Sequence, residues 1–476
     1  MKLEEYRSYR GLPAVAGICS IAEAAKPGLS VEQCVTRLKR YHYALKRLHQ
    51  IFTARLTAEP VYELKMGFSF HAHLCADHVA ALRKRVSEMR EPPLGLESVP
   101  DKSLELLFDE ILAAPSTPEL LVGLYGVAIP AVVRALQRHL QDTNLLVDHP
   151  SVRLCRFALL ELEDIADYGE RAITCMVDAQ VRHAMSDWVQ LLQDCLASAG
   201  DLHGADPMQS RTLRLMHSAA PYRYDGVPRR DERFPDPYNM GVHAETFLYD
   251  EKQKPEDKSL MMFYKRLREI DVPEMMASII TETPGKPWGY YQDMTRQLWD
   301  EARHAMMGEV GFAQAGVNWP EHVRINFTWS LALNTQLTAD ERHSVLYFIE
   351  QGLMPRNGKR YEWEVGLKSG SAFTATIQDY DWADEVLHAR IGRDWYVSRF
   401  KGASEAVEVG DHNWSKALID WGNYRELGLT QHFNWWPGLY RVACEARGTI
   451  PDPTVLSYST TYETTRADLK TKVGSA

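Results

Sequence analysis

Apolar residues recur at three- and four-residue spacing along most of this chain, which is the period of a helix that buries one face. Over residues 1–200 the pattern predicts long helices separated by short polar or proline-containing segments. Few segments alternate with period two, so strands should be rare and the fold class should be all-α. The helices expected here are Val31–Leu56, with Ser30 as its N-cap, Val61–Arg90, Thr117–Leu140, Ser151–Val177 and Val181–Ala199.

The pattern changes over residues 201–255, where glycine, proline and charged residues typical of loops accumulate. A loop of this length is uncommon inside one compact domain, so we expect it to connect two helical halves. The predicted organisation is a helical domain (1–200), this connection (201–255), a helical bundle (256–400) and a C-terminal extension (401–476).

The helical pattern resumes near residue 257. Pro273 should kink the first helix of this half or mark a fresh start. Thr338 and Glu341 have the spacing of a capping box, which places a helix start at Thr338. The helices expected here are Lys258–Thr283, Tyr290–Gly311, a segment from Pro320 to Leu333, Thr338–Leu353 and a helix within Ser369–Phe400.

Composition and charge restrict the function classes. With 476 residues, 45% hydrophobic and 25% charged, the chain has the composition of an ordinary globular protein. Its net charge of -10 argues against broad nucleic-acid binding. No run approaches the length of a membrane span and the N-terminus is a poor signal peptide, so we expect a cytoplasmic protein without a membrane partner. The seven scattered cysteines contain no Cys-x-x-Cys pair and predict reduced, buried thiols.

Two tetrapeptides carry candidate chemistry: Glu301–His304 (Glu-Ala-Arg-His) and Glu385–His388 (Glu-Val-Leu-His). Residues three apart on a helix share a face, so each places a carboxylate beside an imidazole. One such turn alone is usually a solvated helix surface. Four-helix bundles hold a pair of iron or manganese ions with two such Glu-x-x-His turns and one Glu from each of two further helices.

The two further carboxylates must come from the helices that precede these turns. Facing residues of an antiparallel helix pair lie about equally far from the turn, which favours Glu274 over Glu282 as the partner of Glu301. Glu341 is accounted for by the capping box, whereas Glu350 follows an apolar run and needs a partner on a buried face. The predicted metal ligands are therefore Glu274, Glu301, His304, Glu350, Glu385 and His388.

Three neighbouring residues should support these ligands. Asp300 and Asp384 each directly precede the Glu of a turn. Such an aspartate can accept a hydrogen bond from the free nitrogen of a ligating histidine and so fix its tautomer. Arg303 should pair with one of the two aspartates inside the bundle.

At this point the chain resembles a known family. Residues 300–304 (Asp-Glu-Ala-Arg-His) match the Asp-Glu-x-Arg-His signature of ferritin-like di-iron oxygenases and acyl-carrier desaturases. Residues 384–388 resemble its second copy, with Leu387 where some members carry Arg. The resemblance implies a ferritin-like four-helix bundle that binds two Fe ions bridged by Glu301 and Glu385, with Glu274 and Glu350 as terminal or switching carboxylates. It also implies O2 as co-substrate.

The same resemblance implies a non-haem di-iron oxidoreductase that oxidises a small organic substrate. An electron-donor protein is a further expected partner, and a homodimer is allowed for. A manganese/iron or zinc site stays open, because these ligands suit several divalent ions. The alternatives are a ferroxidase or other iron-handling ferritin-like protein, and a metal-free helical scaffold.

The N-terminal half of the sequence resembles a degenerate copy of the C-terminal half. His78 would align with His304, and Cys75 then stands where a ligand Glu is expected. Glu63 and Glu161 are the candidates for remaining buried carboxylates. We interpret residues 1–200 as a degenerate duplicated bundle without metal. The alternative is that these histidines are ordinary core or polar residues.

Overall fold

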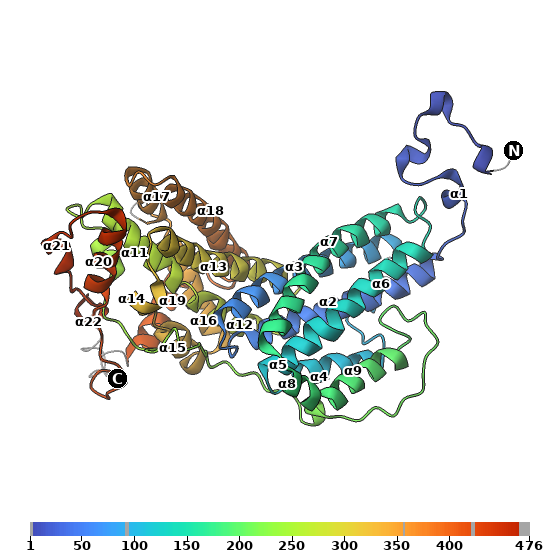
Figure 1. Cartoon of the computed structure of the whole chain (residues 1–476), viewed down its shortest axis with the longest axis horizontal. Coiled ribbons are helices and arrows are strands. Elements are labelled where there is room, and N and C mark those ends of the chain that lie inside the picture. Colours follow the sequence, from blue (N-terminus) through green and yellow to red (C-terminus); the bar gives the residue numbers. More distant parts are fainter. Residues whose placement is uncertain (1–2, 91–94, 356–357, 420–423, 466–476) are drawn as a thin grey trace. The chain divides into compact units, whose positions relative to one another are not determined.

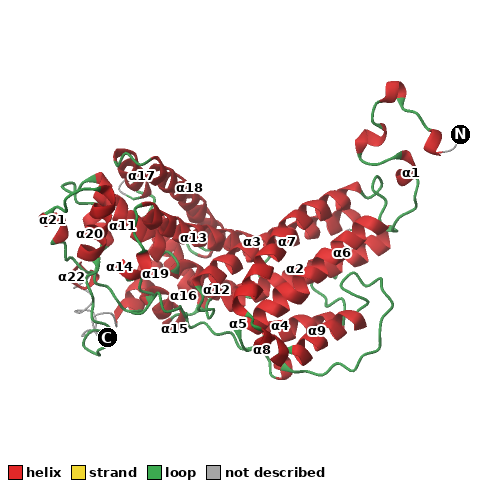
Figure 2. Ribbon diagram, viewed as in Figure 1, coloured by secondary structure: helices red, strands yellow, loops and turns green. Residues whose placement is uncertain are grey.

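The computed structural model describes residues 3–90, 95–355, 358–419 and 424–465. Helices account for 69% of the chain, and the described part contains no strand (Figures 1 and 2). The prediction of an all-α fold class is therefore confirmed.

The chain divides into two compact units. The first unit consists of residues 1–52 and 71–223, and the second of residues 53–70 and 224–476. The boundary near residue 223 lies inside the predicted connection 201–255. The sequence pattern did not indicate that residues 53–70 belong with the second unit, because they lie in and between two long helices of the N-terminal half.

Long helices supply most of the first unit, and those at Val31–Leu56, Tyr62–Met89 and His149–Met176 have bounds close to those predicted. The helix predicted over Val181–Ala199 is instead two helices, and the helix Lys102–Leu112 was not predicted. Ser30 accepts a hydrogen bond from the Gln33 N–H, so the predicted N-cap is confirmed. Tyr41 donates to the carbonyl of Ala135 at 3.1 Å and ties α2 to α6. The helices are α1 (Ile21–Ala24), α2 (Val31–Leu56), α3 (Tyr62–Met89), α4 (Lys102–Leu112), α5 (Thr117–Leu121), α6 (Ile129–Asp142), α7 (His149–Met176), α8 (Ala179–Ala184) and α9 (Ser186–Ser198), with 3-10 turns η1 (Leu3–Glu5), η2 (Tyr9–Gly11), η3 (Ala14–Gly17) and η5 (His217–Ala219).

The stretch Thr117–Asp142 is helical throughout but contains the π-helical turn η4 (Val122–Ala128). By length and composition this stretch could cross a membrane, which corrects the expectation that no run approaches that length. Its most apolar window is 72% buried inside the protein, as in the core helix of a globular fold. The π turn places Tyr125 against Gly169, where a Cβ atom would lie 2.3 Å from the tyrosine side chain.

The structure does not support the two carboxylates proposed for a faded site in the first half. Glu63 is largely exposed and pairs with Arg233, in the second unit. Glu161 is nearly half exposed and forms an ion pair with His78, at 2.8 Å. Cys75 is fully buried, as are most of the other free cysteines, but Cys175 is exposed and departs from the expected burial.

The second unit holds the remaining helices, and its capping box at Thr338 and Glu341 is confirmed. The single helix expected from Pro320 to Leu333 is instead two helices, α14 and α15, separated by an extended segment. The helices are α10 (Ala244–Leu248), α11 (Pro255–Arg268), α12 (Asp271–Glu282), α13 (Trp288–Gln314), α14 (Trp319–His322), α15 (Thr328–Gln336), α16 (Ala339–Gly352), α17 (Lys359–Lys368), α18 (Ala372–Trp395), α19 (Ala403–Leu418), α20 (Trp436–Arg447), α21 (Pro453–Leu456) and α22 (Tyr462–Thr465), with the 3-10 turn η6 (Val397–Arg399).

The break expected at Pro273 falls earlier, between α11 and α12 at Glu269 and Ile270. A proline ring clashes with the carbonyl of the residue four positions before it, which here is Glu269. The helix therefore ends before that carbonyl, and Pro273 sits in the first turn of α12, where its missing N–H costs little.

Two backbones approach closely where α11 packs on α13. A Cβ atom on Gly308 would lie 2.3 Å from the backbone nitrogen of Leu267 and 2.5 Å from the carbonyl oxygen of Phe263. Only a glycine fits this position without moving a helix. The close approach holds the C-terminal end of α11 against the part of α13 that carries His304.

The C-terminal extension is part of the second unit's interior. Asn413 of α19 donates to the Ser344 hydroxyl of α16 at 2.9 Å. Tyr458 donates to the carbonyl of His243 at 2.6 Å, and Tyr462 is almost fully buried. The end of the tail expected from residue 457 onward lies outside the described residues.

Candidate metal centre

Buried acidic and imidazole side chains from α13, α16 and α18, together with Glu269 at the end of α11, meet inside the second unit. They form two adjoining groups. Each residue of a group offers one carboxylate oxygen or imidazole nitrogen, and within a group these atoms all lie within 4.8 Å of one another. The first group is Glu301, Glu350, Glu385 and His388, and the second is Glu269, His304 and Asp381.

His304 is the imidazole of the second group. Its Nδ1 atom lies 3.4 Å from Glu269 Oε2, 3.5 Å from Glu301 Oε2 and 3.4 Å from Asp381 Oδ1. Its Nε2 atom lies 3.2 Å from Asp384 Oδ2. The ring therefore turns one nitrogen toward three carboxylates and uses the other to bond a fourth.

His388 has the same arrangement in the first group. Its Nδ1 atom lies 3.1 Å from Glu301 Oε1 and 3.4 Å from Glu385 Oε2, and its Nε2 atom lies 3.4 Å from Asp300 Oδ2. Glu301 thus presents one oxygen to each imidazole, which is the position of a carboxylate that could bridge two ions.

Asp300 and Asp384 bond the imidazoles crosswise. The aspartate on α13 faces the histidine on α18, and the aspartate on α18 faces the histidine on α13. Arg303 donates to both aspartates, at 2.8 Å from Asp384 Oδ2, so it joins the two pairs instead of the single one expected. A carboxylate on Nε2 keeps the proton there and leaves the Nδ1 lone pair free for a ligand.

Several atoms of the two groups are buried without a hydrogen-bond partner among the described residues. A buried polar atom left unpaired costs about 1–3 kcal/mol, so such atoms require an explanation such as an ion. Carboxylate oxygen and imidazole nitrogen are donors that suit divalent iron, manganese and zinc. The atoms are Nδ1 of His304 and His388, Oε2 of Glu269, Glu350 and Glu385, and Oδ2 of Asp381.

The protonation equilibria indicate an excess of negative charge. Burial alone would lower the pKa of His304, but the carboxylates of Asp384, Glu269 and Glu301 outweigh it and raise this pKa to about 10. Burial, followed by the charge of Glu385, raises the pKa of Glu350 well above its ordinary value. His304 and Glu350 therefore tend to hold protons, which a divalent ion would displace, whereas the charge of Lys359 lowers the pKa of Glu385.

Two cations nevertheless reach into the second group. Lys359, the first residue of α17, places Nζ 2.7 Å from Glu385 Oε1, 2.9 Å from Asp381 Oδ1 and 3.5 Å from Glu269 Oε1. Arg266 donates to the same oxygen of Asp381 as Lys359 does. Both side chains are fully buried, so their charges are compensated only by these and neighbouring carboxylates.

The structure does not bring Glu274 to this centre. Its carboxylate accepts hydrogen bonds from Arg230, at 2.9 and 3.1 Å, and from Ser330, and it forms an ion pair with Lys65 at 2.8 Å. It is fully buried, but its charge is compensated in this separate cluster. Glu269 occupies the position that the helix-hairpin argument assigned to Glu274, because the break before α12 shifts the register.

Glu269, Asp381 and Lys359 are the residues of the centre that sequence reasoning missed. Pro273 was a signal for Glu269, since it excludes helix at the carbonyl four residues before it. Asp381 lies one turn before Glu385, on the same face of α18. Nothing in the sequence pattern indicated Lys359, which is brought in by a helix that was not predicted.

Other possible ligand groups lie in the first unit: Cys34, His139 and Asp148, and Asp201, His203 and Asp206. Arg85 pairs with Asp148 at 3.0 Å, which compensates its charge. Asp206 is exposed. Neither group has the excess of buried carboxylates found in the second unit.

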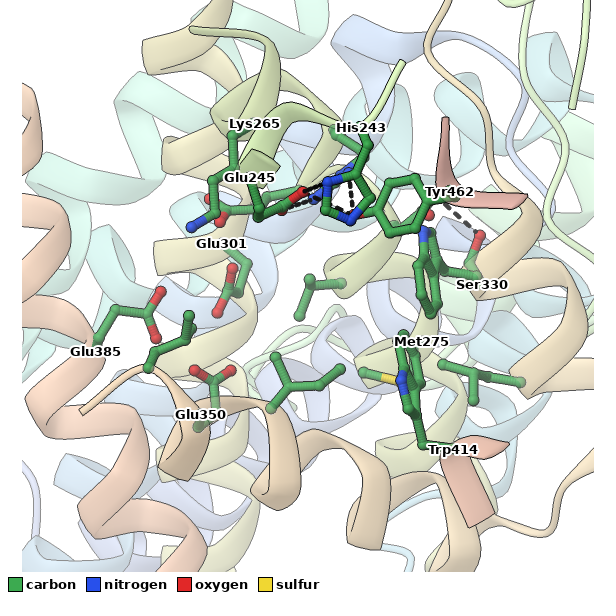
Figure 3. Close-up of a pocket in the computed structure, with 18 of the residues that line it drawn as sticks. His243, Glu245, Lys265, Met275, Glu301, Ser330, Glu350, Glu385, Trp414 and Tyr462 are labelled. Carbon is green, nitrogen blue, oxygen red and sulfur yellow. Dashed lines mark hydrogen bonds and ion pairs between the residues drawn. The ribbon is translucent and has the colours of Figure 1, made fainter. Parts of the chain in front are cut away.

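A cavity of about 370 Å³ adjoins the centre and is lined in part by Glu269, Glu301, Glu350 and Glu385. Figure 3 shows Glu301, Glu350 and Glu385 on one side of this cavity and Tyr462 and Trp414 on the other. The carboxylates are thus reachable from a space large enough for a small molecule.

Comparison with protein-family models, with curated proteins and with solved structures found no match for this chain.

Proposed function

We propose that this protein is a non-haem di-iron oxidoreductase that uses O2 to oxidise a small organic substrate. The observation that supports it most is the set of unpaired ligand-type atoms on His304, His388, Glu269, Glu350 and Glu385, buried around one point. Hydrogen bonding within the described chain does not account for these atoms, whereas two divalent cations would.

In this proposal α11 and α12 together, α13, α16 and α18 are the four helical segments of a ferritin-like bundle. Glu269 and His304 would hold one ion, and Glu350, Glu385 and His388 the other. Glu301 would bridge them, because its two oxygens face different imidazoles. Each of two helices then contributes a Glu-x-x-His turn, as in other di-iron carboxylate bundles.

The iron pair would supply the electrons and the open coordination positions for reaction with O2. The surrounding residues prepare the site. Asp300 and Asp384 hold both imidazoles with Nδ1 toward the centre, and Arg303 fixes the two aspartates. Burial of the carboxylates excludes bulk water, which strengthens the electrostatic interactions around the centre.

The cavity favours an organic substrate over simple iron oxidation. A ferroxidase needs a polar route for ions, whereas the lining of this cavity also contains Met275, Leu333, Leu353 and two tryptophans. Apolar lining with a few polar groups is typical of sites for small organic molecules.

One observation favours the alternative of a metal-free helical protein. The ammonium group of Lys359 lies within 3.5 Å of Asp381, Glu385 and Glu269 and supplies part of the charge that an ion would supply. Among the described residues, Lys359 forms no ion pair with Glu350 and no hydrogen bond with His388. We therefore treat it as a partial counter-ion, which an iron ion would have to displace or accompany.

The test is anaerobic loading of the full-length protein with Fe(II), followed by removal of unbound metal and elemental analysis. The proposal predicts close to two irons per chain and a change in visible absorption when O2 is added. Glu301→Ala should lose most of the iron. The matched control is Glu161→Ala, which removes a carboxylate beside a histidine in the first unit.

Iron content near zero in the wild-type protein, or equal iron content in wild type and Glu301→Ala, would refute the di-iron proposal. If the protein purifies with stoichiometric manganese or zinc in place of iron, the proposed ligands stand and the identity of the metal is revised. Loss of iron in Glu161→Ala as well would mean that the substitutions act through folding.

A further inference from the structure

The cavity beside the carboxylates has one strongly aromatic wall. Trp329 of α15 and Trp414 of α19 stack with ring centroids 3.8 Å apart and planes inclined by 6°. Tyr462 packs edge-on against Trp329 at 5.9 Å. Both tryptophans are partly exposed and both line the cavity. A planar apolar ligand would find a matching surface here, since aromatic rings favour offset stacking and edge contacts.

The cations on the cavity wall are already neutralised by protein carboxylates. Arg268 donates to Glu245 Oε1 at 2.7 Å and to the Tyr462 hydroxyl at 2.7 Å. Lys265 forms an ion pair with Glu362, outside the wall. An anionic ligand would therefore meet no uncompensated positive charge among the described lining residues, and its desolvation would not be repaid.

His243 leaves one hydrogen-bond donor for a ligand. Its Nδ1 atom accepts the backbone N–H of Thr246 at 3.1 Å, so this nitrogen carries no proton and the neutral ring carries its proton on Nε2. No described residue accepts a hydrogen bond from Nε2. Figure 3 shows the ring beside Tyr462, whose ring centroid is 4.2 Å away.

We propose that this cavity binds a neutral, planar, apolar molecule that carries a hydroxyl or carbonyl oxygen, with its rings against Trp329 and Trp414 and its oxygen accepting from His243. The cavity volume of about 370 Å³ lies near the lower end of the ~300–1,000 Å³ range of small-molecule sites. It therefore suits a ligand of roughly two fused rings. Binding is independent of metal, and only the ligand's role as the oxidised substrate rests on the proposed function.

The test measures binding of three probes of one shape to the metal-free full-length protein by isothermal titration. The probes are 2-acetylnaphthalene, naphthalene and 2-naphthoate. We expect 2-acetylnaphthalene to bind about tenfold tighter than naphthalene, as one buried hydrogen bond would give. The carboxylate of 2-naphthoate should weaken binding below that of naphthalene.

Two variants assign the contacts. His243→Asp keeps an acceptor for the Thr246 N–H but, as a carboxylate, offers no hydrogen-bond donor, and it should abolish the preference for 2-acetylnaphthalene over naphthalene. Trp329→Leu should weaken all neutral probes by about tenfold. The control is Trp363→Leu, because Trp363 is also partly buried but packs against Trp382 away from the cavity lining.

Equal binding of naphthalene and 2-acetylnaphthalene, or tighter binding of 2-naphthoate, would overturn the proposal. Unchanged binding in Trp329→Leu, tested together with Trp414→Leu, would do the same. Iron analysis of the same preparations separates the two proposals. Selective probe binding without iron uptake would refute only the di-iron function, and iron uptake without selective binding would refute only the ligand assignment.

Discussion

Lys359→Met tests whether the buried carboxylates carry negative charge in the folded protein. The Lys359 Nζ atom is fully buried and lies 2.7 Å from Glu385 Oε1 and 2.9 Å from Asp381 Oδ1. Methionine keeps most of the side-chain volume and removes only the charge and the hydrogen bonds. Removal of one partner from a buried ion pair costs about 3–5 kcal/mol, because the other charge stays buried without compensation.

The assay is urea unfolding of the metal-free protein followed by tryptophan fluorescence. Trp188 excepted, every tryptophan belongs to the second unit, so this signal reports on the unit that contains the centre. Lys416→Met is the matched control. Lys416 also forms an ion pair, with Glu341 at 3.0 Å, but it is about half exposed, and its loss should cost about 0–1 kcal/mol.

Addition of Mn(II) should then separate two effects. If an ion occupies the centre, it supplies the charge that Lys359→Met has removed, so the variant should gain more stability from Mn(II) than the wild type does. Equal unfolding free energies for metal-free Lys359→Met and Lys416→Met would refute the reasoning. That result would mean that protons already neutralise the carboxylates around Lys359.

Three further predictions concern packing, pH and the ligand set. Gly308→Ala should lower the unfolding free energy by about 1–3 kcal/mol in urea titrations, because overpacking against the α11 backbone outweighs the gain in helix propensity; Gly438→Ala, where a Cβ meets open space, should raise it by about 0.4–1 kcal/mol. Burial lowers the pKa of His71 to about 3, so its neutral form contributes stability above about pH 6.5 that is lost as pH falls toward 3. Over this range His71→Asn should reduce the slope of the unfolding free energy against pH by at most about 1.4 kcal/mol per pH unit. Glu274→Gln should leave the iron content of loaded protein unchanged, whereas Glu269→Gln should lower it; the opposite result would restore the ligand set predicted from sequence.

Periodicity and local capping signals were sufficient for most helices. Val31–Leu56 was predicted with the observed bounds because Ser30 marks its start and apolar spacing is sustained along it. The start at Thr338 was predicted because the capping box is a local interaction between residues three apart. Such signals depend on a few neighbouring residues and need no knowledge of the tertiary structure.

The errors have tertiary causes. Glu274 was chosen over Glu282 and Glu269 was not considered, because finding it required the exact register of α11 and α12; a break a few residues from its expected place changes which carboxylate faces α13. Lys359 enters the centre through packing of α17 on α18, which no local pattern encodes. The aromatic wall joins Trp329 and Trp414, whose proximity depends on the path of the whole C-terminal extension.

The division of the chain into interleaved segments limits how the protein can be dissected. Residues 53–70 belong with residues 224–476 although 71–223 intervene, so the polypeptide passes from one unit to the other three times. A fragment that begins at residue 224 would lack Lys65 and Thr57, which contact Glu274 at 2.8 and 3.0 Å. No single proteolytic cut or expression boundary yields the second unit intact, and deletion mapping would report failed folding as a loss of metal binding.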